Sequence, residues 1–169
     1  MEVAATRPGP AGRAARAPGD DYSCARVWAA LTSAHARITG QLGAALDEAC
    51  GLSINDFEIL LRLEQAAPAG LRQGGLDPAV RLTQPSLSRA VARLERRGWL
   101  RRARSAADRR GVIVSITPAG RDLLRRAAAV HAQTIREFLL DPLSQEEQDL
   151  LASALARLAE ADHPAKGTA

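Results

Sequence analysis

Apolar residues recur every three or four positions along most of the chain, which predicts a mainly helical protein. The first such pattern covers residues 21–50 and ends at Gly51, a suitable left-handed residue after a helix. Its apolar members are Val27, Leu31, Ala34, Ile38, Leu42 and Ala45. A second helix is expected from Ser53, because Asp56 follows three residues later and completes a capping box.

A third capped helix is predicted over residues 83–97, after a short segment at 71–82. Thr83 is a good N-cap, and Gly98 stands where a left-handed C-cap is needed. Three apolar residues at helical spacing form its expected buried stripe: Leu87, Val91 and Leu94.

Beyond Gly98 the period changes to two, which predicts strands at 99–104 and 112–116 joined by a polar turn. Thr117 and Pro118 then begin a helix expected to reach about Leu140. Its inward residues are expected to be Leu123, Leu124, Ala127, Val130, Ile135 and Phe138. A capping box opens a last helix with a leucine stripe, formed by Ser144 and Glu147 and then Leu150, Leu151, Leu155 and Leu158.

The two ends lack this periodicity. Residues 1–20 are rich in Ala, Gly, Pro and Arg and are expected to be a disordered tail, and residues 162–169 a loose one. The folded part is therefore expected over 21–161, with a winged-helix unit at about 53–117 between long helices.

The distribution of charge indicates a candidate binding partner. The net charge is +4, and eight arginines lie between Arg93 and Arg110 against two acids, Glu95 and Asp108. Arginine in place of lysine can reflect a G+C-rich genome, but the clustering favours a polyanion as partner. The order of helices followed by a basic hairpin is typical of a winged helix-turn-helix, whose recognition helix enters the major groove of double-stranded DNA.

The candidate DNA-binding residues lie on the outer face of the third helix and along the hairpin. Glutamine can pair with adenine and arginine with guanine or phosphate, so this face has the chemistry of base readout. The set comprises Thr83, Gln84, Ser86, Ser88, Arg89, Arg93, Arg96, Arg104, Arg109 and Arg110.

Several other classes find no support. Two cysteines, Cys24 and Cys50, make neither a disulfide framework nor a zinc motif, and no catalytic motif is present, so neither an enzyme nor a cofactor is expected. Residues 1–20 lack the apolar region of a signal peptide, and no stretch could span a membrane, so a cytoplasmic protein is expected.

Two runs within 21–161 resemble the MarR family of transcriptional regulators: LTQPSLSRAVARLERRG, and Asp108-Arg109-Arg110 followed by VSITPAG. The resemblance implies a homodimer built by the first helix, at about 21–50, together with the last two, at about 118–161, and commonly a repressor on an inverted-repeat operator. It also implies that Arg109 or Arg110 reaches the minor groove. One departure is Pro78, which interrupts the helix expected before the recognition helix.

The resemblance further implies a small phenolic or anionic effector in a crevice beside the dimerisation helices. Trp28, His35, Phe57 and Glu58 are candidates to line it, with His35 facing inward. The alternative is that the aromatic residues are core and His35 an ordinary histidine. Cys24 and Cys50 have no basic partners in sequence that would activate a thiol, which favours inert residues.

The sequence therefore predicts a sequence-specific DNA-binding transcriptional regulator. The rival class is a winged-helix dimer that binds a ligand or a protein and not DNA; the basic recognition face argues against it.

Overall fold

The computed structural model describes residues 19–76, 80, 82–104 and 111–160. The chain divides into two units, Met1–Ala36 and Arg37–Ala169. Helix α1 (Gly19–Cys50) supplies all of the described part of the first unit and the beginning of the second. Among the described residues, no helix combines the length and apolar character needed to cross a bilayer.

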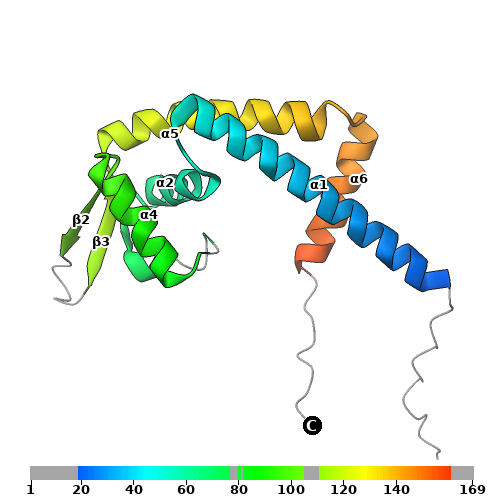
Figure 1. The fold of residues 1–169 in the computed structure, drawn as a ribbon, viewed down its shortest axis with the longest axis horizontal. Coiled ribbons are helices and arrows are strands. Elements are labelled where there is room, and N and C mark those ends of the chain that lie inside the picture. Colours follow the sequence, from blue (N-terminus) through cyan, green and yellow to red (C-terminus); the bar gives the residue numbers. More distant parts are fainter. Residues whose placement is uncertain (1–18, 77–79, 81, 105–110, 161–169) are drawn as a thin grey trace, which may run out of the picture. The chain divides into compact units, whose positions relative to one another are not determined.

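The second unit contains the elements that the sequence predicts, in the predicted order (Figure 1). After α1 come helices α2 (Ile54–Gln65) and α4 (Gln84–Arg96), strands β2 (Leu100–Arg104) and β3 (Val112–Ile116), and helices α5 (Pro118–Ile135) and α6 (Gln145–Glu160). The mainly helical, winged-helix fold class is thus confirmed. The last five residues of the helix expected to reach Leu140 form a wider π-type turn, η2 (Arg136–Leu140).

The local signals that set these boundaries are present as side-chain contacts. At the start of α2, Asp56 N donates to Ser53 Oγ, and Ser53 N donates to the Asp56 carboxylate, both at 3.2 Å. Ser144 and Glu147 make the same reciprocal pair before α6. Gly51 and Gly98 take positive φ values of 63° and 74°, so both predicted helix ends are confirmed.

The sheet has three strands and not the two expected. A short strand β1 (Leu71–Arg72) pairs with β3, so the antiparallel order is β1-β3-β2. Its two residues are too few to show an alternating pattern, which explains why the sequence did not reveal it. A short 3₁₀ turn, η1 (Gln73–Leu76), follows it, whereas Pro78 lies outside the described residues.

One core unites α2, α4, the sheet and α5. The stripe predicted on α4 is buried, and Ala90 joins it. The expected inward face of α5 and η2 is buried at Leu123, Leu124 and Ala127 and only half-buried at Val130, Ile135 and Phe138. Burying these aliphatic side chains, each contributing about 1.5–3 kcal/mol, is what holds the unit together.

Two predicted apolar stripes are not covered within a single chain. In the first unit, the side chains of Val27 and Trp28 are 62% and 68% exposed. In the second unit α6 buries none of its residues, and Leu150 and Leu158 are 65% and 69% exposed. Along the first stripe Val27, Leu31 and Ala34 are exposed in the single chain, and burial begins at Leu42.

The wing, which is the hairpin of β2 and β3, lies very close to the start of α5. Thr117 caps α5 by accepting from Gly120 N at 3.1 Å, and its hydroxyl donates to Gly98 O at 2.7 Å. A Cβ on Gly120 would lie 2.0 Å from Trp99 O, closer than any side chain can tolerate. Only glycine allows α5 to start against Trp99, the residue before β2, in this way.

We therefore expect Gly120→Ala to lower the free energy of unfolding by about 3 kcal/mol, as overpacking against backbone does. Chemical denaturation measures this change. Gly43→Ala is the matched control, because its new Cβ would meet only the Ile54 side chain at 3.7 Å. Equal stability of both variants would contradict this account of the junction.

Candidate nucleic-acid interface

Helix α4 begins with a small polar network on its exposed side. Thr83 is the N-cap by backbone geometry but makes no capping hydrogen bond with its side chain. Its hydroxyl donates instead to Ser86 Oγ at 3.0 Å, and Arg89 Nη2 donates to the same oxygen at 3.1 Å. Ser86 thus orients the Arg89 guanidinium beside the first turn of the helix.

The two faces of α4 differ sharply in character. Leu87, Ala90, Val91 and Leu94 are buried in the core, whereas the predicted recognition residues lie on the other side. Thr83, Gln84, Ser88, Arg89 and Arg96 are exposed, and Ser86 and Arg93 are half-buried. The helix therefore presents hydroxyl, amide and guanidinium groups to solvent from a rigidly packed base.

Arg93 has a structural partner that the sequence did not indicate. Its Nη2 donates to Asp56 Oδ1 at 2.6 Å, and the Asp56 side chain is only 6% exposed. The other carboxylate oxygen of Asp56 accepts from Ser53 N and from Ser53 Oγ. One carboxylate thus caps α2 and holds α4 against it, so Arg93 positions the recognition helix through its pair with Asp56.

A second ion pair joins α4 to the wing. Arg102 on β2 donates to Glu95 Oε2 from Nε at 2.8 Å and also from Nη2, and its backbone N donates to Oε1 at 3.2 Å. The hydrogen bond from Arg102 lowers the pKa of the Glu95 carboxyl and raises that of the guanidinium. Both groups stay charged around neutral pH, so Arg102 is engaged within the chain.

The outer end of the wing contains the remaining candidates. Arg104 is exposed at the end of β2, opposite Val112 in the β2–β3 ladder. Arg109 and Arg110 lie outside the described residues.

The four candidates for an effector crevice fall into different parts of the chain. Trp28 and His35 belong to the first unit and are exposed there, so the expectation that His35 faces inward is wrong for the single chain. Phe57 is buried in the second unit and Glu58 is half-buried. Phe57 stacks on His131, with ring centroids 4.9 Å apart. His131 was not among the candidates, although it lies seven residues after Leu124 on the inward side of α5.

No group of three or more His, Cys, Asp or Glu side chains among the described residues could hold a metal ion. The chemistry that the described surface offers is that of hydrogen bonding and positive charge.

Comparison with known proteins gives consistent results. The family model described as MarR family matches residues 52–112. The HTH-type transcriptional regulator PecS of Dickeya dadantii is 33% identical over 108 residues, which are 63% of this chain and 64% of PecS. This chain thus spans slightly less than two thirds of PecS.

Two solved structures from Streptomyces coelicolor are similar over nearly their full length. Sco3205, a MarR family transcriptional regulator in complex with DNA, is 31% identical with a TM-score of 0.72, covering 83% of this chain and 91% of its own. AbsC, also a MarR family transcriptional regulator, is 30% identical with a TM-score of 0.72, covering 86% and 97%. These relatives are regulators and not enzymes, as expected from the sequence.

The Asp56–Arg93 pair can be tested by Asp56→Asn, which preserves shape but removes the charge. We expect a loss of about 1.5–3 kcal/mol in unfolding free energy, the range for hydrogen bonds to a charged group. Asp122→Asn is the control, because its pair with Arg125 is exposed and worth less than about 0.5 kcal/mol. If Asp56→Asn and Asp122→Asn lose similarly small amounts of unfolding free energy, by thermal and by chemical unfolding, then Asp56 does not hold α4 against α2.

Proposed function

The chain belongs to the MarR family, and from this premise we propose that it is a transcriptional regulator that binds a specific double-stranded operator as a homodimer. The observation that carries the proposal is the exposed polar and basic face of α4, mounted on a buried apolar stripe. The solved complex of Sco3205 with DNA supports it over a winged-helix module without DNA binding. Acting on DNA, the protein would work in the cytoplasm.

In this proposal the start of α4 enters the major groove. Gln84, Ser88 and Arg89 are exposed there, and Arg89 is held by Ser86 and not by an acid. An arginine in this position is suited to the O6 and N7 acceptors of guanine, and Gln84 to adenine. Arg96, further along the same face, is better suited to a phosphate contact.

The wing supplies the second contact. Arg104 is exposed at the end of β2, and Arg109 and Arg110 follow it in sequence. We infer that these arginines contact phosphates or the adjacent minor groove, where a narrow groove attracts guanidinium groups. Arg102 is excluded from this role because Glu95 engages it.

Dimerisation would cover the two exposed apolar stripes. A face with Leu150, Leu151, Leu155 and Leu158 in solvent is an aggregation liability in a monomer. The same liability applies to the exposed apolar residues of α1, which are Val27, Trp28 and Leu31. A two-fold dimer formed by these helices would set two recognition helices about 34–36 Å apart and would select an inverted repeat.

The proposal includes repression and release by a small effector. A dimer bound over a promoter blocks polymerase, and an aromatic or anionic molecule bound beside Phe57 and Glu58 would change the spacing of the recognition helices. On the second unit the half-buried His131, which stacks on the buried Phe57, would offer such a molecule an aromatic contact.

The direct test of readout is Arg89→Ala, measured by fluorescence anisotropy on the DNA upstream of the protein's own gene. We expect specific affinity to fall by about 1–3 kcal/mol and preference to relax at one base position per half-site. Arg126→Ala, which removes the same charge from the exposed side of α5, is the control and should bind as wild type. Equal loss on specific and random DNA would show that Arg89 contacts phosphate only.

The dimer can be tested by replacing Leu150 and Leu158 together with glutamine. We expect monomers by analytical ultracentrifugation, unchanged helix content, and loss of most specific DNA affinity, because a single half-site contact is weak. Gln145→Ala with Asp149→Ala, which removes an exposed polar pair from the same helix, is the control. A glutamine variant that stays dimeric would exclude this face of α6 from the interface.

A further inference from the structure

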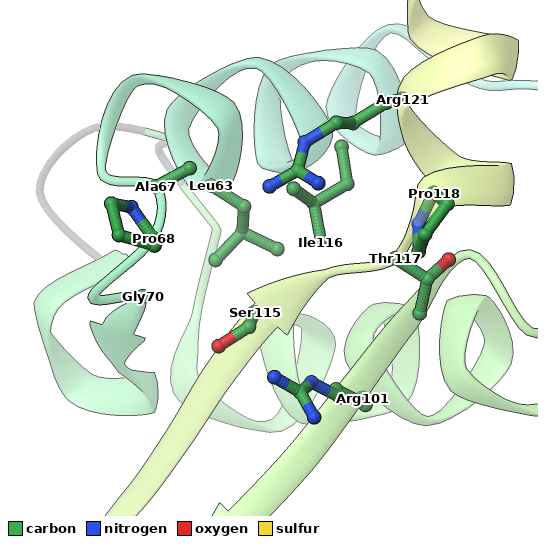
Figure 2. A pocket seen from close by; sticks show the side chains of 10 residues that line it. All are labelled: Leu63, Ala67, Pro68, Gly70, Arg101, Ser115, Ile116, Thr117, Pro118 and Arg121. Carbon is green, nitrogen blue, oxygen red and sulfur yellow. The ribbon is translucent and has the colours of Figure 1, made fainter.

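A pocket of about 420 Å³ lies in the second unit, and none of the residues assigned above to DNA binding or to the effector crevice lines it. The turn after α2, the middle of the sheet and the first turn of α5 enclose it (Figure 2). Its lining is Leu63, Ala67, Pro68, Gly70, Arg101, Ser115, Ile116, Thr117, Pro118 and Arg121.

The register of the wing explains why an arginine reaches this pocket. Leu100, Arg102 and Arg104 alternate with Arg101 and Ala103 along β2, and Arg101 is paired with Ser115 on β3. Leu100 and the neighbouring Val114 and Ile116 are buried in the core. Arg101 and Ser115 therefore share the other face of the hairpin, away from α4.

Positive charge in the pocket exceeds negative charge. Arg121 donates to Glu64 Oε2 at 2.7 Å, so this arginine is paired. Arg101, in contrast, makes no side-chain hydrogen bond or ion pair with any residue that the structure describes. No acidic residue lines the pocket, which leaves one guanidinium charge uncompensated there.

Figure 2 shows the two guanidinium groups entering the pocket from opposite sides, with the Ser115 side chain between them. The Ser115 hydroxyl likewise hydrogen-bonds to no described residue. The Thr117 hydroxyl, by contrast, is already used by Gly98 O and Gly120 N. The donors available to a ligand are thus the Arg101 guanidinium, the Ser115 hydroxyl and the guanidinium nitrogens of Arg121 that do not bond to Glu64.

The remaining wall is apolar. Leu63 and Ile116 are buried side chains, and Ala67, Pro68 and Pro118 complete the surface. A pocket of this size with few polar groups and an apolar wall suits a small organic molecule. A planar carboxylate matches the forked donors of arginine better than a spherical ion does.

We propose that this pocket binds a small organic carboxylate with a compact apolar body, the carboxylate held by Arg101 and Ser115 beside Arg121. The site is distinct from the effector crevice around Phe57 and Glu58. Its occupant would link β2, the turn after α2 and the start of α5, the junction at which the wing is attached. Carboxylate binding at this pocket does not require DNA, so its failure is distinguishable from a failure of the proposed function.

The test is a titration of the full ¹⁵N-labelled chain with sodium benzoate at constant ionic strength, followed by NMR. We expect saturable shifts of the amides of Gly70, Ser115 and Arg121, with benzamide, the uncharged analogue, binding at least tenfold more weakly. Arg101→Met, which retains the aliphatic stem, should weaken benzoate binding at least tenfold. Arg126→Met removes one charge from α5 outside the pocket and should bind as wild type.

Three outcomes would overturn the proposal. The first is equal benzoate affinity of Arg101→Met and wild type. The second is benzoate shifts confined to α1 or to the amides around Phe57. The third is no saturable shift up to about 10 mM, an affinity too weak for a specific site. Because exposed Arg101 has no structural partner among the described residues, the variant is expected to fold, and its spectrum verifies this directly.

Discussion

The carboxylate of Asp56 is the contact on which the proposed recognition surface depends. It is almost fully buried, and it accepts from the Ser53 amide and hydroxyl at one oxygen and from Arg93 at the other. A buried carboxylate is tolerated only when donors satisfy it in this way. The same group therefore fixes where α2 starts and where α4 lies upon it, so the orientation of Arg89 and Gln84 follows from an interaction inside the domain.

The wing is held by a different constraint, the contact between Gly120 and Trp99. The first turn of α5 approaches the Trp99 carbonyl so closely that only a residue without Cβ fits there. This contact fixes the base of the hairpin to α5. The Glu95–Arg102 pair then joins β2 to α4. Recognition helix, wing and α5 are thus linked by these two contacts, through which a displacement of one element would be transmitted to the others.

Much of this architecture was predictable because its signals are local. Both capping boxes, the positive-φ glycines after α1 and α4, and the alternation along β3 are read within a few residues of sequence. The buried face of α4 followed from spacing alone. The short strand β1 did not, since two residues carry no periodicity, and its pairing with β3 depends on tertiary contact.

The partners of charged side chains were the least predictable feature. Arg93 has the position of a DNA-contacting residue on α4, yet it pairs with Asp56, 37 residues earlier in the chain. Nothing in the spacing separates it from Arg89, whose contact is a serine on its own helix. The leucines of α6 were predictable by contrast: apolar periodicity identified them, no other element of the sequence was placed to cover them, and they are exposed in the single chain.

The central claim is that two α4 helices of a dimer read one operator from the same side of the duplex. Hydroxyl-radical footprinting of the DNA upstream of the protein's own gene measures this most directly. The account predicts protection on one face of the duplex, in two inverted half-sites whose centres are about 10 base pairs apart. Uniform protection that matches random DNA, or a single protected half-site at saturating protein, would contradict it.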